Sequence, residues 1–418
     1  METSLTEDVS KNGKEKSKLK IHIILFVILG LVIVGLIVGI LVMKKEHKTK
    51  EIQFDYFGTI EVPSHYWEYF GEIQTNISYA KNNMIENTFG IEGENYNSNN
   101  FNVNDGKNYI ANDKNVYDLF IPHSAKLKAD TSEIQGVFLF IHGGAWIQGD
   151  KKDMYELCEI YAERGYVTTS MDYSLLNQYN DTNIFRILDE ITFCLDSIKQ
   201  KLGELGLNNL RFAIGGHSAG AHLSLLYTYL IKNKHNIKFV IDIEGPISLD
   251  KKNYYILKTN DTLPDLKLST VEKALKEGKF TNNNYITDVL ILQLMNYFTG
   301  QKYNEKDLSE MLDKNKLIIE NNPKYKELYN SIKNSFPIDI EDKNKIPTLC
   351  FYGGYDFIIG IPQYPYLKEK ADRDNKILEL VYGRYTGHEF INLSFESSIK
   401  ACRLFDLKVL EYAKKYFI

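Results

Sequence analysis

The feature of this 418-residue sequence that most constrains its fold is an alternation of short apolar runs with longer amphipathic segments, which begins at Val116. Runs such as Val137 to Ile141 are apolar at every position, which is typical of strands buried on both faces of a parallel sheet. The pattern predicts a doubly wound α/β domain with a mostly parallel sheet and helices on both faces. The expected strands are 116–120, 136–141, 166–171, 210–214, 239–243, 347–352 and 377–381, and the expected helices are 154–164, 184–202, 219–231, 363–371 and 393–416.

The alternation is interrupted between Ile247 and Lys345, where the chain becomes polar and helical. So long an insertion between two neighbouring strands indicates a helical cap, and the alternative is a surface decoration far from the site. The insertion holds one apolar stretch, Val289 to Met295. Its side chains are expected either to line an acyl pocket or to form the cap's own core.

A second apolar segment, Ile21 to Met43, contains only His22 as a polar residue. It is long enough for a transmembrane helix, and it is too long for a cleaved signal peptide, which would also need small residues before the cut. We therefore expect a single-pass signal anchor. Residues 1–20 would then be a cytoplasmic tail, residues 44–115 a juxtamembrane tether with an Asn-rich extension, and residues 116–418 the catalytic domain.

Lysines flank both ends of the apolar segment, so the charge rule hardly decides its orientation. We expect the N-terminus in the cytoplasm and the catalytic domain on the extracytoplasmic side of the membrane. Gly35 and Gly39 form a GxxxG pair, which would allow two such helices to approach and form a homodimer.

Charge and cysteine usage exclude several classes of partner and cofactor. The formal net charge is −5 and no basic stripe is present, so we expect no nucleic-acid partner. The four cysteines, Cys158, Cys194, Cys350 and Cys402, are far apart and lack metal-ligand spacing. They are interpreted as buried thiols, although disulfides stay open. We expect neither a metal nor an organic cofactor.

The clearest chemical motif is Gly216–Gly220, with sequence Gly-His-Ser-Ala-Gly, between an expected strand and an expected helix. A serine on such a sharp turn needs small neighbours two residues away, which Gly216 and Gly220 provide. Without this context the motif would fit an ordinary glycine-rich turn equally well. We therefore predict that Ser218 is a nucleophile.

A second glycine-rich stretch, His142 to Trp146, follows the strand that ends at Ile141. Acyl transfer needs backbone N–H groups that stabilise a developing oxyanion, one after the nucleophile and others in a loop after an earlier strand. The expected donors are the amides of Gly143, Gly144, Ala145 and Ala219. The alternative is a tight turn that needs glycines for steric reasons alone.

The serine needs a base and an acid, which in this class of enzyme follow it in the order acid, then histidine. His388 is the only histidine beyond residue 235, and it follows the last expected strand. Asp356 lies just after the strand that ends at Tyr352, where the acid is expected. The predicted triad is Ser218, Asp356 and His388.

These motifs together resemble the hormone-sensitive-lipase-like esterases and their kynurenine-formamidase relatives, over about residues 105–415. The matching segments are 142–146 with 149–151, 172–175, 216–223, 353–356 with 361–362, and 387–388. Members usually carry arginine where Ser174 stands, and often a second glycine where Ala221 stands. The resemblance implies an α/β-hydrolase fold and an intact triad of Ser218, Asp356 and His388.

The function expected from these residues is hydrolysis of short- to medium-chain carboxylic esters through an acyl-enzyme on Ser218. A small-molecule amide, such as a formamide, is the alternative substrate for the same residues. A catalytically silent membrane ectodomain is a third interpretation, which the complete triad disfavours.

Overall fold

The computed structural model describes residues 49–54, 72–79, 112–122, 136–178, 182–258, 263, 267–281, 285–354, 356–383, 386–388 and 396–417. The expected transmembrane segment 21–43, with its GxxxG pair, lies outside these residues. Among the helices that are described, none has both the length and the apolar character that crossing a bilayer requires.

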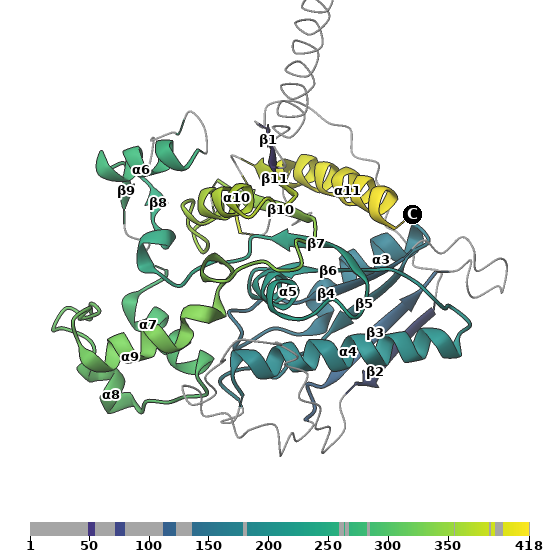
Figure 1. Cartoon of the computed structure of the whole chain (residues 1–418), viewed down its shortest axis with the longest axis horizontal. Coiled ribbons are helices and arrows are strands. Elements are labelled where there is room, and N and C mark those ends of the chain that lie inside the picture. The colour runs from purple at the N-terminus through teal and green to yellow at the C-terminus, as the bar shows by residue number, and fades with distance from the viewer. Residues whose placement is uncertain are drawn as a thin grey trace, which may run out of the picture. The chain divides into compact units, whose positions relative to one another are not determined.

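A nine-stranded sheet forms the centre of the described structure (Figure 1). Its strands lie in the order β1-β11-β10-β7-β6-β4-β5-β3-β2, and all neighbours are parallel except the β2–β3 and β3–β5 pairs. The strands are β1 (Thr49–Phe54), β2 (Glu72–Ser78), β3 (Val116–Ile121), β4 (Val137–Ile141), β5 (Val167–Met171), β6 (Phe212–His217), β7 (Ile237–Ile243), β10 (Thr348–Gly353) and β11 (Leu378–Gly383).

Helices cover both faces of this sheet, which explains why its central strands are apolar throughout. The helices α4 (Ile184–Glu204), α5 (Ala219–Leu230) and α10 (Gln363–Arg373) pack into one hydrophobic cluster. The helices α3 (Tyr155–Glu163) and α11 (Glu396–Tyr416) contribute to a second cluster with Phe138 and Phe239. The prediction of an α/β fold with a mostly parallel sheet is confirmed.

Two strands come from residues 44–115, the segment expected to be a tether and extension. β1 pairs in parallel with β11, with Ile52 opposite Val381, and β2 pairs antiparallel with β3. Each lies at one end of the strand order, so these two short strands are the edge strands of the sheet. Their alternating, half-polar sequences resemble the surrounding polar chain, which is why the apolar-run pattern did not identify them.

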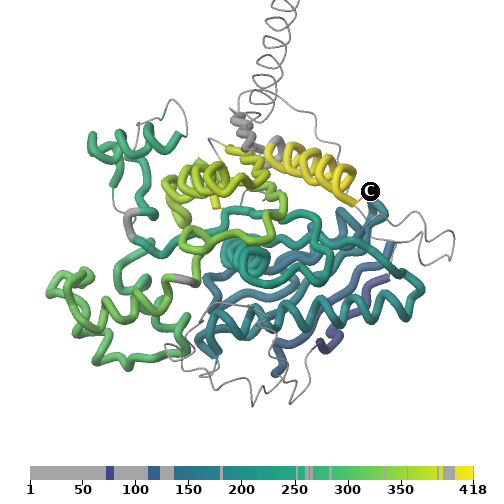
Figure 2. The backbone as a smooth tube through the Cα atoms, in the orientation of Figure 1, coloured from purple at the N-terminus to yellow at the C-terminus, as the bar shows by residue number. Residues whose placement is uncertain are grey.

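The insertion between β7 and β10 is a separate set of short elements, as Figure 2 shows by its excursion from the sheet and its return. It contains η4 (Lys251–Tyr254), β8 (Ile256–Leu257), α6 (Leu268–Lys276), β9 (Phe280–Thr281), α7 (Asp288–Phe298), α8 (Glu305–Glu310), α9 (Pro323–Ile332), η5 (Lys333–Ser335) and η6 (Pro337–Asp339). On α7, Leu294 and Met295 are buried in the main core cluster. They therefore serve as core residues of this region.

Candidate active site

Ser218 occupies the sharp turn between β6 and α5. Its backbone has φ 53° and ψ −117°, a left-handed conformation that costs a non-glycine residue about 1–3 kcal/mol. The Ser218 amide donates a hydrogen bond to the Ile243 carbonyl at 2.8 Å, which ties the turn to the end of β7. The fold thus maintains a strained serine at the carboxyl edge of the sheet, where α/β proteins bind ligands.

Gly216 and Gly220 allow this turn to pack against the end of β4. A Cβ at either position would overlap the Ile141 carbonyl oxygen. Any larger residue would push the strand end away from the serine, so the two glycines are required by close approach of the backbone.

The loop after β4 lies beside the serine. Gly144, Ala145 and Trp146 all have positive φ, at 99°, 50° and 62°. A Cβ placed on Gly143 would lie 3.3 Å from the Ser218 Cβ, so the loop packs closely against this serine. Within the described part of the chain, no hydrogen bond uses the amides of Gly143, Gly144 or Ala145. These N–H groups are therefore available to a ligand.

His142 and Tyr173 orient the loop from its buried side. Their rings stack at 4.3 Å, the His142 Nδ1–H donates to the Gly143 carbonyl at 2.8 Å, and the Tyr173 hydroxyl donates to it at 3.3 Å. In a trans peptide the next N–H points opposite to the carbonyl. The Gly144 N–H is thus directed away from this pair. Burial lowers the pKa of His142, so its ring is neutral.

Trp146 anchors the loop to the cap. Its indole Nε1–H donates to His222 Nδ1 at 3.1 Å, and His222 Nε2–H donates to the Ser335 carbonyl at 2.8 Å. The Trp146 ring also meets Phe298 of α7 edge-on, with ring centroids 4.8 Å apart. The loop after β4, helix α5 and the insertion between β7 and β10 are therefore joined through one buried histidine.

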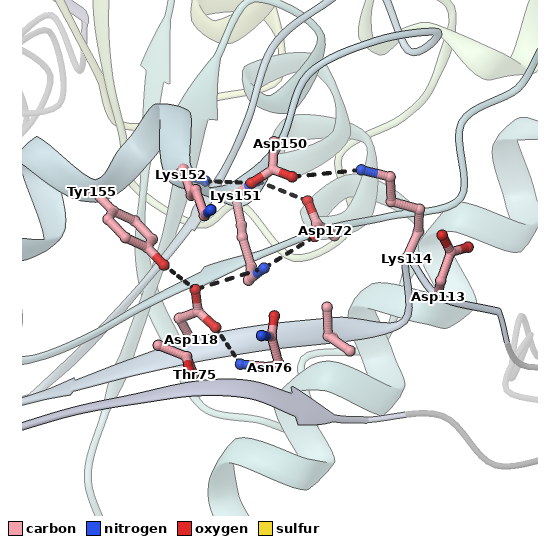
Figure 3. Close-up of a pocket in the computed structure, with 11 residues that line it drawn as sticks. Thr75, Asn76, Asp113, Lys114, Asp118, Asp150, Lys151, Lys152, Tyr155 and Asp172 are labelled. Atoms are coloured by element: carbon pink, nitrogen blue, oxygen red, sulfur yellow. Dashed lines mark hydrogen bonds and ion pairs between the residues drawn. The ribbon is translucent and has the colours of Figure 1, made fainter.

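The end of the loop after β4 that leads into Lys151 is held by buried charged side chains, which Figure 3 shows. The Lys151 amide donates to Asp172 at 2.7 Å, and its ammonium lies 3.4 Å from Asp172 and 3.7 Å from Asp118. Tyr155 donates to Asp118, which also accepts the amide of Asn76 on β2. These residues border a polar cavity of about 440 Å³ whose lining includes no predicted triad residue.

Ser174, where the resembling family usually has arginine, lies against a fully buried carboxylate. Glu190 accepts hydrogen bonds from the Ser174 amide at 2.8 Å and from the Ser174 hydroxyl. Arg186, one turn earlier on α4, lies 3.5 Å from the same carboxylate. The guanidinium that contacts this carboxylate therefore comes from α4.

The expected acid and base are hydrogen-bonded to each other. His388 Nδ1–H donates to Asp356 Oδ2 at 2.9 Å. The other carboxylate oxygen of Asp356 accepts the amides of Ile358 at 2.7 Å and Ile359 at 2.8 Å, which holds the carboxylate in place. With the proton on Nδ1, the lone pair of His388 resides on Nε2, as a general base requires.

His217, the residue before Ser218, contacts His388 of this acid–base pair. The His217 ring lies 4.7 Å from the His388 ring, and His217 Nε2–H donates to the His388 carbonyl at 2.6 Å. In the described residues, the Ser218 hydroxyl and His388 are not themselves hydrogen-bonded. Such bonds commonly tighten only when substrate binds.

One residue of this cluster was missed by the sequence reasoning. Glu244 directly follows β7, is fully buried, and lies 3.6 Å from His388 Nδ1 and 3.7 Å from His217 Nε2. The signal was its place after an expected strand, as for Asp356. One imidazole nitrogen each of His217 and His388 and one carboxylate oxygen of Glu244 lie within 4.8 Å of one another. Both ring nitrogens that face this carboxylate are already hydrogen-bonded, His388 Nδ1 to Asp356 and His217 Nε2 to the His388 carbonyl.

The four cysteines are free thiols. Cys158, Cys194 and Cys350 are buried, and burial raises the pKa of each well above its ordinary value. Cys402 is half-buried. The interpretation as buried thiols is thus confirmed for three of the four.

Comparisons with known proteins give a family model over more than half of the chain and a curated relative over a shorter segment. A family model described as BD-FAE matches residues 118–371. Kynurenine formamidase of Drosophila melanogaster is 33% identical over 87 residues, which are 21% of this chain and 27% of that protein. The chain thus matches about a quarter of the length of this curated relative.

Two solved structures match the chain at low sequence identity. Esterase B from Lactobacillus rhamnosis is 14% identical, with a TM-score of 0.49 over 85% of this chain and 89% of that chain. A truncated carbohydrate esterase from gut microbiota is 13% identical, with a TM-score of 0.49 over 83% of this chain and 98% of that chain.

Proposed function

Because the chain belongs to the α/β-hydrolase-like BD-FAE family, we propose that it is a serine hydrolase that cleaves carboxylic esters of short to medium acyl length. The proposed triad is Ser218, His388 and Asp356. The observation that carries the proposal is the 2.9 Å hydrogen bond from His388 Nδ1 to Asp356, formed beside a serine on a strained turn.

In the first half of the reaction, Ser218 Oγ attacks the ester carbonyl carbon and its proton passes to His388 Nε2. The carbonyl π pair moves to oxygen, and the amides of Ala219 and Gly144 stabilise the oxyanion, with Gly143 or Ala145 as a further donor. Asp356 stabilises the imidazolium without taking the proton. Collapse of the intermediate expels the alcohol, which receives the proton from His388.

In the second half, water replaces the alcohol. His388 removes a proton from water, the hydroxide attacks the acyl carbon, and the Ser218 oxygen leaves with the proton that His388 returns. The enzyme is regenerated and the carboxylic acid is released. The strained turn at Ser218 contributes by presenting Oγ at the sheet edge in every cycle.

The first test is labelling and turnover. A fluorophosphonate probe should label the wild-type protein, and p-nitrophenyl acetate should be hydrolysed. Ser218→Ala should abolish labelling and reduce kcat by about 10³-fold or more, because it removes the attacking atom. Ser197→Ala on α4 is a matched control and should keep both signals. A folded Ser218→Ala protein with normal turnover would refute the proposal.

A second candidate activity is hydrolysis of an activated amide by the same residues. It is favoured by the local similarity to kynurenine formamidase, which covers 87 residues. The two are separated by comparing kcat/KM for a p-nitrophenyl ester with kcat/KM for an N-formyl aromatic amine. A ratio in favour of the formyl compound would make the amide the preferred class of substrate.

We further propose that residues 21–43 anchor the chain in a membrane, with the catalytic domain on the extracytoplasmic side. The apolar length of this segment and the lysines on both sides support the anchor. The same segment's GxxxG pair supports a homodimer through the anchor.

The cap supports a preference for acetyl to hexanoyl esters over palmitoyl esters, since a finite pocket under it would exclude long chains. The test is kcat/KM across a p-nitrophenyl ester series, and an optimum at long chains would contradict it.

A further inference from the structure

We propose that Glu244 is a second carboxylate for the catalytic histidine, which stabilises the protonated ring of His388 together with Asp356. This inference rests on the proposed serine hydrolase function. In the strand order, β7 lies between β6, which leads to Ser218, and β10, which leads to Asp356. A carboxylate at the end of β7 is therefore between the nucleophile and the acid.

The distances place Glu244 within electrostatic reach of the reacting ring. Its Oε2 lies 3.6 Å from His388 Nδ1, beyond hydrogen-bond distance, whereas Asp356 Oδ2 is hydrogen-bonded to the same nitrogen at 2.9 Å. The same oxygen lies 3.7 Å from His217 Nε2. The side chain of Glu244 is fully buried, so water screens its charge far less than it would at the surface.

The local backbone is built to hold the side chain there. Glu244 has φ 55°, and its amide donates to the Phe351 carbonyl of β10 at 2.8 Å. A Cβ on Gly353 would lie 2.8 Å from Glu244 Oε1 and 2.7 Å from the Gly387 carbonyl. Gly353 therefore leaves room for the carboxylate and the histidine loop to meet at the end of β10.

The chemistry needs such a charge when the proton of Ser218 reaches His388 Nε2. The imidazolium then faces Glu244 after β7, Asp356 after β10 and His217 at the end of β6. Only one oxygen of Asp356 meets the ring, because the other accepts two amides. A second buried carboxylate beside the ring attracts the positive charge that forms there and so favours the transfer.

The experiment measures kcat/KM for p-nitrophenyl acetate from pH 5 to 9 in the full-length protein. Glu244→Gln removes the charge and keeps the shape of the side chain. It should lower kcat about 10- to 100-fold and move the acid limb of the profile to lower pH, because the ring loses an attractive charge. Glu190→Gln, at another fully buried carboxylate, is the matched control and should leave the limb in place.

Asp356→Asn provides the second variant. With Glu244 beside the ring, its loss of kcat should be about 10²-fold, whereas removal of the sole acid of a triad costs about 10⁴-fold. The double variant Glu244→Gln, Asp356→Asn should then lose about 10⁴-fold.

The outcomes separate this inference from the function on which it rests. A wild-type protein that neither labels nor hydrolyses esters overturns the proposed function. An active wild type whose acid limb is unmoved in Glu244→Gln overturns the role of Glu244 alone. Should Glu244→Gln fail to fold, a full 10⁴-fold loss in Asp356→Asn overturns that role as well.

Discussion

His222 should make the protein sensitive to acid, and replacing it should remove that sensitivity. The ring is fully buried and neutral, and it joins Trp146 of the oxyanion loop to Ser335 of the cap. His222→Gln preserves both contacts, since an amide oxygen accepts from the indole and an amide N–H donates to the carbonyl. The variant differs mainly in that it cannot be protonated.

The magnitude follows from the pKa of the buried ring. Burial lowers the pKa of His222 from 6.5 to about 3. Between those values the unfolded chain binds a proton that the folded chain does not, so stability falls as pH falls. The contribution is fully present above pH 6.5. Between pH 6.5 and pH 3 the free energy of unfolding falls by about 5 kcal/mol from this group, and by pH 4.5 it has fallen by about 3 kcal/mol.

The assay is urea unfolding of both proteins at pH 7.5 and pH 4.5. At pH 7.5 the two free energies of unfolding should lie within about 1 kcal/mol of each other, because both hydrogen bonds are kept. At pH 4.5 the wild type should have lost about 3 kcal/mol more than the variant. His142, whose pKa burial also lowers, is present in both proteins and cancels. A stability difference that does not change with pH would refute the reasoning.

Two further outcomes follow. Burial raises the pKa of Asp242 to about 6, so the wild type should lose about 3 kcal/mol of stability as pH rises from 4 to 6. Asp242→Asn should flatten this pH dependence in thermal melts across the same range. An unchanged slope in the variant would contradict the prediction. Deleting residues 1–44, which keeps β1 and its pairing with β11, should release active enzyme from the carbonate-washed membrane fraction. Full-length protein found in the supernatant would contradict the anchor.

The sequence predicted the interior of the sheet well, because burial on both faces leaves a clear apolar signal. The expected strand 347–352 became Thr348–Gly353, and the expected helix 184–202 became Ile184–Glu204. The edge strands β1 and β2 left no such signal, since each has only one strand neighbour and a half-polar sequence. Pairing across hundreds of residues, as between β1 and β11, is not encoded in local periodicity.

In the structure, the motif residues fall into two groups by location. Gly143 packs against Ser218 at the carboxyl edge of the sheet, and the catalytic roles of both residues stay predictions. Lys151 and Asp172, by contrast, form a buried charge pair at the end of the loop after β4. The sequence alone could not separate these roles, because a lysine and an aspartate distant in the chain become partners only when β5 aligns beside β4.

Glu244 shows where sequence reasoning about a site meets a physical limit. Asp356 was selected because it follows the penultimate expected strand, whereas Glu244 follows the strand before that one. Whether such a carboxylate reaches the histidine depends on the direction of its side chain at the strand end. Glu244 is turned by a positive φ, a conformation that sequence preferences assign to glycine or asparagine. A local conformation that the residue type disfavours is stabilised only by tertiary contacts, here the bond to Phe351 and the space left by Gly353. Residues held in this way are found by structure and then tested by their chemistry.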